Sequence, residues 1–335
     1  MNIHNFPKWQ ENAGQQLDRA RDARKILLIY TGTLVLTSLL VTVVNFFLSR
    51  QISQAGGGLG TMGTRSVLSA LRTMLPIVQS LLMMAVEFGY IAAMLRISRG
   101  QYASPMSMKM GFERFWKLLR ATLLQAGVYF AACFTSFYLA MQVFLLTPLG
   151  SSAINLLLPY VSQTTDPQAA LELLGEAGQL ELLGTMIPLF FLTALFGGLF
   201  LVPISYQYRM VNYVLMDEPR FGGLLAIAAS KRMMRGNRFK LFRVDLKLWW
   251  YHGLQLFAAA LCYGDILLPM LGVQLPFSDT VSYYLFYGLF LIVQTAIFLL
   301  FRNKVEVIYA QAYESLRPKP VEDQGGVVLG NIFQM

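Results

Sequence analysis

The stretch "ILLIYTGTLVLTSLLVTVVNFFL", residues 26–48, is 23 residues long and contains no charged side chain. A helix of about 20 apolar residues crosses the roughly 30 Å of hydrocarbon in a bilayer. The composition of the whole chain agrees with this segment, because 56% of its 335 residues are hydrophobic and 13% are charged, against about 25% charged in ordinary soluble proteins. We therefore expect an integral membrane protein built from helices.

Similar apolar runs along the chain predict an all-α membrane bundle of six transmembrane helices. The expected spans are residues 26–48, 67–95, 121–146, 182–208, 248–273 and 281–301. The second and fifth spans are less apolar than the others. The second contains Arg72 and Glu87, and the fifth contains His252 and Asp265.

Lys and Arg side chains gather in the predicted connections on one side of the membrane. They lie before the first span, between the second and third, between the fourth and fifth, and after the sixth. An excess of Lys and Arg marks the cytoplasmic side, so we expect a multi-pass protein of the bacterial inner (cell) membrane with both termini in the cytoplasm. The predicted parts are a cytoplasmic basic helix at residues 1–25, a membrane domain at 26–304 and a cytoplasmic tail at 305–335.

A basic amphipathic helix is expected on the cytoplasmic side, in residues 225–237. Spacing of 100° per residue separates apolar side chains such as Met234 from a group of four cations. These cations are Lys231, Arg232, Arg235 and Arg238. Trp249 and Trp250 follow, as is typical of the headgroup layer. We interpret the helix as an interfacial anchor whose partners are anionic lipid headgroups, and we expect no nucleic acid partner.

The predicted outer connection, residues 147–183, has the opposite character, because its charged residues are acidic. Asp166 is placed to cap a helix that has Pro167 at its first position. Leucines alternate with glutamates in the sequence that follows. We expect an amphipathic hairpin on the outer side, acting either as a lid or as a packing cover.

Two adjoining segments, "YQYRMVNYVLMDEP" and "AIAASKRMMRGNRFKLFRVDL", carry a resemblance to a known family. They resemble the signature of uncharacterised, mainly Gram-positive, multi-pass membrane proteins catalogued as domain of unknown function nine-seven-five. The matching positions are Tyr208, Asp217, Pro219, Ser230, Met234, Gly236, Asn237, Lys240, Phe242 and Asp245. The chain departs from that signature after Leu246, where it reads "KLWWYHG". The resemblance implies a fold and topology, and it brings no catalytic residues.

No convergent set of nucleophile, acid, base and metal ligands stands out in the sequence. The two histidines are His4, in the N-terminal segment, and His252, near the inner face. The glycine-rich "AGGGLG" at residues 55–60 lacks the strand and the following Lys-Ser or Lys-Thr of a phosphate loop. We therefore predict a protein that is not an enzyme and has no cofactor and no metal site.

Charged residues inside the predicted spans indicate a functional site more clearly than any catalytic motif does, because a charge in hydrocarbon needs a partner or water. The candidates for a ligand site or ion path are Glu87, Asp265, Arg72, His252 and Arg209. Depth alone suggests His252 or Arg209 as the partner of Glu87, and Arg72 as the partner of Asp265. The carboxylates are interpreted either as interhelical locks or as parts of a path. The predicted function is binding of lipid or an amphipathic peptide between helices, with a transporter or channel as the alternative.

Overall fold

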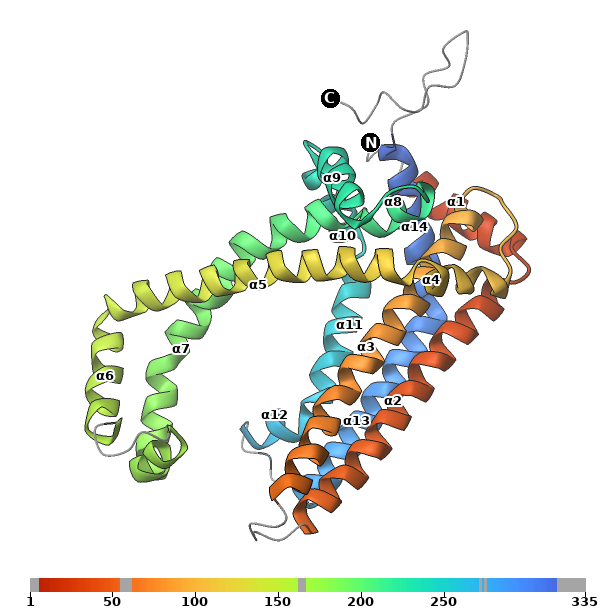
Figure 1. Cartoon of the computed structure of the whole chain (residues 1–335). Coiled ribbons are helices and arrows are strands. Elements are labelled where there is room, and N and C mark those ends of the chain that lie inside the picture. The colour runs from red at the N-terminus through yellow and green to blue at the C-terminus, as the bar shows by residue number, and fades with distance from the viewer. Residues whose placement is uncertain (1–5, 55–61, 162–166, 271–272, 274–275, 318–335) are drawn as a thin grey trace. The chain divides into compact units, whose positions relative to one another are not determined.

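The computed structural model describes residues 6–54, 62–161, 167–270, 273 and 276–317 (Figure 1). All regular secondary structure in this part of the chain is helical, which confirms the all-α class. The helices are α1 (Phe6–Arg19), α2 (Ala23–Gln54), α3 (Met62–Ser98), η3 (Pro105–Lys109), α4 (Met110–Glu113), α5 (Phe115–Leu145), α6 (Pro148–Val161), α7 (Pro167–Tyr208), α8 (Val211–Asp217), α9 (Gly223–Met234), α10 (Arg238–Lys247), α11 (Trp249–Cys262), α12 (Gly264–Met270), α13 (Asp279–Ile297), η4 (Phe298–Arg302) and α14 (Asn303–Leu316).

Five helical stretches of the described chain are long and apolar enough to cross a bilayer, as expected of a membrane protein. They are Ala23–Gln54, Gly63–Ser98, Phe115–Leu145, Gly184–Asp217 and Thr280–Leu316. Each overlaps one of the spans expected from the sequence. Their apolar surfaces are largely exposed in the isolated chain, which is the condition of helices that face lipid.

The remaining expected span, residues 248–273, is interrupted. It forms α11, of 14 residues, and α12, of 7 residues, with a break at Tyr263. At this break Gly264 lies so close to α13 that a Cβ atom would stand 2.4 Å from the Phe286 ring. The two helices therefore approach closely at the break, and a sixth complete span stays a prediction.

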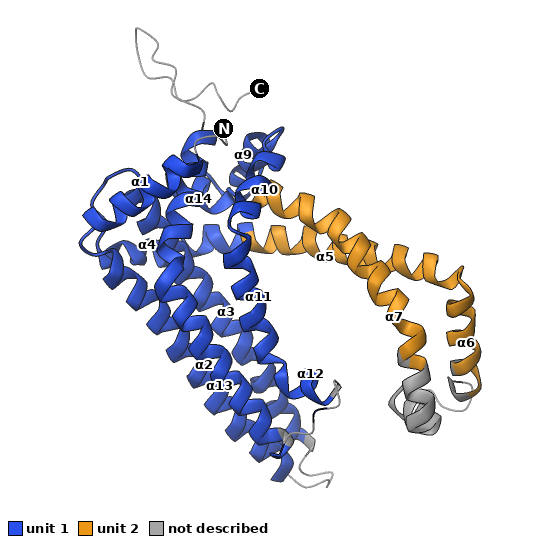
Figure 2. Ribbon diagram, turned by 180° about the vertical axis from the view of Figure 1, so that it is seen from behind, with its two compact units in different colours: residues 1–121, 210–335 blue, residues 122–209 orange. Residues whose placement is uncertain are grey.

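The described chain divides into two compact units, coloured separately in Figure 2. Unit 1 contains residues 1–121 and 210–335. In it α2 packs along α3, α11 packs along α13, and α14 packs against α1 and α3. Its most buried side chains, among them Tyr90 and Tyr313, lie where the last turns of α3 meet α14. The core of unit 1 is therefore at the end of the bundle that carries α1 and α14.

The predicted cytoplasmic tail begins at residue 305, and residues 303–316 form helix α14, which packs in the core of unit 1. Val305, Val307, Ile308, Tyr309 and Tyr313 are all buried there. The short π-helical turn η4 precedes α14 and changes the phase of the helix. The segment follows α13 without a break, so it reaches the core as a continuation of the last span.

Unit 2, residues 122–209, contains most of α5 together with α6 and α7. Here α6 packs against α7, and Ala140, Phe144, Ala153 and Leu189 form a buried cluster. Helix α7 begins at Pro167, as predicted, and continues without a break to Tyr208. The expected outer segment and the fourth span therefore share one helix. The predicted cap by Asp166 and the acidic face at residues 172–181 lie outside the described residues and side chains.

Candidate ligand-binding site

An ion-pair cluster centred on Arg302 lies at the end of unit 1 where α3 meets α14. Its Nη2 donates to Glu87 Oε1 at 2.9 Å and lies 3.7 Å from Glu306 Oε2. Tyr213 donates to the other oxygen of Glu306 at 2.5 Å. The guanidinium also lies over the rings of Tyr30 and Phe298, at 5.9 and 5.4 Å from their centres. The cluster joins α2, α3, α8 and α14.

A second ion-pair cluster is centred on Asp217, the last residue of α8, and lies near the C-terminal end of α14. Arg99 Nη2 approaches one of its oxygens at 2.6 Å, and Arg317 Nε lies 3.3 Å from the other. Tyr313 donates to Asp217 at 2.7 Å, and Arg99 also pairs with Glu314. These contacts tie the ends of α3, α8 and α14 together.

The partner expected for Glu87 was wrong, because Arg302 takes that place. His252 instead lies 3.3 Å from the Tyr309 hydroxyl, which donates to Asp245 at 2.5 Å. Arg209 belongs to unit 2, between α7 and α8. The physical reason is that Arg302 was expected just after the sixth span, whereas η4 continues α13 and brings Arg302 against Glu87 on α3.

A cavity of about 580 Å³ lies near the opposite end of the same bundle. Most of its lining residues carry a polar group, although apolar atoms also contribute to its wall. The lining residues are Val41, Thr42, Asn45, Ser49, Arg72, Asp265, Thr280, Tyr283, Tyr284 and Tyr287. Four helices contribute: α2, α3, α12 and α13. Asp265 and Arg72, which were matched by depth, thus line one cavity.

The charges of this cavity differ from those of the ion-pair clusters at Arg302 and Asp217. Within the described residues, neither Arg72 nor Asp265 takes part in an ion pair or hydrogen bond. The Oδ1 atom of Asn45 is buried and also lacks a hydrogen-bond partner in this part of the chain. The cavity does not reach Glu87, which is 15 residues beyond Arg72 on α3, about 22 Å along a helix. Glu87 and Asp265 therefore lie in separate surroundings.

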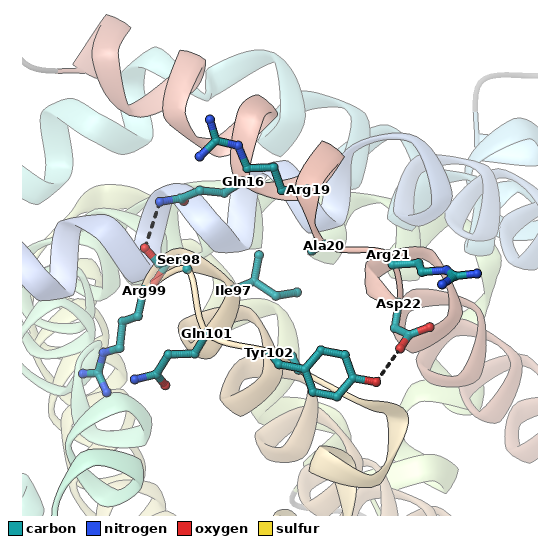
Figure 3. Close-up of a pocket in the computed structure, with 12 residues that line it drawn as sticks. Gln16, Arg19, Ala20, Arg21, Asp22, Ile97, Ser98, Arg99, Gln101 and Tyr102 are labelled. Carbon is teal, nitrogen blue, oxygen red and sulfur yellow. Dashed lines mark hydrogen bonds between the residues drawn. The ribbon is translucent and has the colours of Figure 1, made fainter.

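Another pocket, of about 520 Å³, lies between the end of α1 and the turn after α3 (Figure 3). Tyr102 donates to Asp22 across its rim at 2.9 Å, and Lys25 pairs with the same carboxylate at 3.0 Å. The bonds from Lys25 and Tyr102 lower the pKa of Asp22 below its usual value. Arg19 and Arg21 point away from the middle of the pocket. Its acid is already neutralised and its cations face outward, so it offers less to a ligand than the cavity at Asp265.

Comparison with known families places the chain in a group recognised by its sequence. The family model described as "Protein of unknown function (DUF975)" matches residues 18–292. The chain belongs to the DUF975 family. Searches of curated proteins and of solved structures gave no match.

Several residues at which the chain resembles the family signature have a structural role at the turn between α9 and α10. Gly236 ends α9 with a φ of 77°, a conformation that disfavours other residues. Asn237 donates to the Met233 carbonyl and accepts from Lys240. Ser230 and Met234 are completely buried on α9. The signature thus fixes the turn from α9 to α10 in this DUF975 protein.

Other residues at which the chain resembles the family signature lie at the ends of helices. Asp217 is the centre of the second ion-pair cluster, and Asp245 accepts from Tyr309 on α14. The Pro219 carbonyl accepts from Lys117 Nζ at 2.6 Å. Tyr208 is buried and lies edge-on to Tyr129 within unit 2. Phe242 stays partly exposed on α10.

The basic helix predicted from this part of the DUF975 signature is α9, and its surface is mixed. Ala226, Ala229 and Met234 are buried, whereas Leu224 and Leu225 are exposed. Exposed large side chains continue along α10 and α11 at Phe239, Phe242, Leu246 and Trp249. The exposed cations Lys231, Arg232 and Arg235 lie on the same chain segment. The apolar face expected to enter the lipid is therefore partly used for packing within the protein, and large apolar side chains are exposed on α10 and α11.

Proposed function

We propose that this chain is a non-enzymatic membrane protein that binds a phospholipid between its helices, in the cavity at Arg72 and Asp265. The observation that carries the proposal is a cavity of about 580 Å³ that contains a cation, an anion and several other polar groups among helices with exposed apolar surfaces. Ligand sites in proteins have volumes of about 300–1,000 Å³ and contain a few polar groups that orient the ligand. A phospholipid matches such surroundings, because its head group is polar and its chains can remain against the apolar helices.

Filling the cavity is expected to reduce lipid binding. Replacing Thr42 with tryptophan places a large ring in the cavity wall, and we expect the purified protein to retain less phospholipid after detergent exchange. Thr33→Trp is the matched control, because both hydroxyls bond the carbonyl four residues earlier on α2 and Thr33 does not line the cavity. Mass spectrometry of retained lipid measures the difference. Equal retention by the two variants contradicts lipid binding in this cavity.

A transporter or channel is the second candidate function, and one observation favours it. Asp265 has no ion-pair partner among the described residues and faces a cavity, as a residue that exchanges a proton or cation would. Glu87 does not share this property, because Arg302 neutralises it. Proton-coupled flux in proteoliposomes that is lost in Asp265→Asn and kept in Glu87→Gln would favour transport through the outer half of the bundle.

We also propose that the end of unit 1 carrying α9 and α10 faces the cytoplasm of a bacterial inner membrane. Positive charge marks the inner side, and aromatic residues such as Trp249 and Phe239 suit the depth of the headgroups. In this orientation the cations of α9 lie beside anionic lipid. The cavity at Asp265 then lies toward the outer leaflet.

Neutralising the basic helix is expected to weaken its association with anionic lipid. In the triple variant Lys231→Gln, Arg235→Gln, Arg238→Gln each lost charge removes about 1 kcal/mol of attraction near the surface. The enrichment of spin-labelled phosphatidylglycerol around the protein in liposomes measures this. Arg50→Gln with Arg65→Gln, at the other end of the bundle, is the control for loss of net charge. An unchanged enrichment in the triple variant contradicts the anchor.

A further inference from the structure

The cavity at Asp265 combines three polar groups of different character that the described chain leaves unpaired. Arg72 supplies a cation, Asp265 supplies an anion, and the buried Asn45 Oδ1 supplies a neutral acceptor. A simple polar lock would have joined the two charges, since opposite charges attract strongly where water is scarce. Arg72 and Asp265 face the same space without forming an ion pair of the kind seen between Arg302 and Glu87.

We propose that this cavity recognises a zwitterionic head group with a primary ammonium and a phosphate, that of phosphatidylethanolamine. The proposal rests on the proposed function and specifies its ligand. A head group with one cation and one anion complements the two charges of the wall at the same time. A ligand with a single charge would pair with only one of the two residues, and it would leave the other unpaired or next to a like charge.

The ammonium half of the head group is matched by Asp265, Asn45 and a tyrosine wall. A primary ammonium has three N–H donors, and the carboxylate and the amide oxygen are acceptors for them. Tyr283 and Tyr287 stack with 6.2 Å between ring centres, next to Tyr284. Ring faces attract cations, so these tyrosines add to the preference for the ammonium.

The phosphate half is matched by Arg72, whose planar guanidinium can give two parallel hydrogen bonds to phosphate oxygens. Arg72 lies on α3, whereas Asp265 lies on α12. The two halves of the head group would therefore bridge α3 and α12. The volume of about 580 Å³ leaves room for the glycerol beside the head group.

The same wall discriminates against the other common phospholipids. Phosphatidylglycerol has a phosphate and no cation, so it leaves Asp265 unpaired beside a second negative charge. Phosphatidylcholine has a cation without N–H groups, so it leaves the Asn45 oxygen without a donor. A missing hydrogen bond to a charged group costs about tenfold or more in affinity.

The test uses the full-length protein in vesicles of equal parts phosphatidylethanolamine, N-methylated phosphatidylethanolamine, phosphatidylcholine and phosphatidylglycerol. The protein is re-extracted, and retained lipids are quantified by mass spectrometry. We expect phosphatidylethanolamine to be enriched about tenfold over phosphatidylcholine. The enrichment of N-methylated phosphatidylethanolamine is expected to lie between the two. This comparison needs no variant, so it holds even where a substitution prevents folding.

Two variants then locate the preference. Asp265→Asn and Arg72→Gln are expected to abolish the enrichment, and Arg65→Gln on the same helix is the control that keeps it. Retained lipid without headgroup preference overturns this inference and leaves lipid binding in the cavity standing. Absence of retained lipid overturns both. A competition experiment distinguishes a lipid ligand from a soluble molecule with the same head group. If water-soluble glycerophosphoethanolamine at millimolar concentration displaces the lipid from the protein, the ligand is a soluble zwitterion and the proposal of a lipid ligand is wrong.

Discussion

Replacing Arg302 with methionine is expected to lower the free energy of unfolding by about 3–5 kcal/mol, as for other buried pairs that lose one partner. Arg302 is the cation that Glu87 and Glu306 share, and its side chain is 18% exposed. Glu306 is 8% exposed at its side chain, so after the substitution its charge would stay buried beside the Tyr213 hydroxyl. Methionine preserves the apolar contacts of the arginine stem, so the decrease in the free energy of unfolding measures the effect of removing the charge.

The matched variants separate the two carboxylates. Glu87→Gln is expected to cost about 1 kcal/mol or less, because Glu87 is 46% exposed at its side chain and interhelical hydrogen bonds in membranes are modest. Arg302→Met combined with Glu306→Gln is expected to recover part of the loss, because no buried charge is then unpaired. Denaturation in mixed micelles measures all three. A change below about 1 kcal/mol in Arg302→Met would show that the ion-pair cluster does not hold the helices together.

The sequence was sufficient for the class of fold because the bilayer imposes a simple rule. Uncharged runs such as residues 26–48 are long enough to span, and the structure contains α2 there. Residues 248–273 pass the same composition test, yet the chain breaks at Tyr263. At the break Gly264 packs against Phe286 of the following helix α13, and this packing between helices cannot be read from the composition of the run.

The charged residues of the candidate sites could be predicted from the sequence, but the partners of these residues could not. Arg72, Asp265 and Glu87 stand out because charge is rare inside spans. Asn45 and the tyrosines at 283, 284 and 287 were missed, although a lone amide in the first apolar run and tyrosines spaced by four residues were visible signals. The Arg302 contact was hidden, because it needs the α13–α14 continuation to return to α3.

Substituting Gly111 with alanine is the other change for which a large loss is expected. Helix α4 crosses α3 so closely that a Cβ on Gly111 would stand 1.8 Å from the carbonyl oxygen of Ala85. That obstacle is backbone, so no rotamer change relieves it. Gly89 on α3 is equally confined, with the Met108 carbonyl oxygen 2.3 Å from its Cβ position. We expect Gly111→Ala to cost about 3 kcal/mol, at the upper end of the range for overpacking.

Gly14→Ala on α1 is the control with the opposite expected sign. Nothing lies within 4 Å of its Cβ position, so alanine gains helix propensity and stabilises the protein by about 0.5–1 kcal/mol. Thermal unfolding in detergent compares the two variants. Similar melting temperatures for Gly111→Ala and the unmodified protein would mean that α4 is not held against α3. The close crossing of α4 over α3 also positions Arg114, which donates to the Leu215 and Met216 carbonyls at the end of α8. A displacement of α4 is therefore expected to loosen α8 and the ion pairs at Asp217 as well.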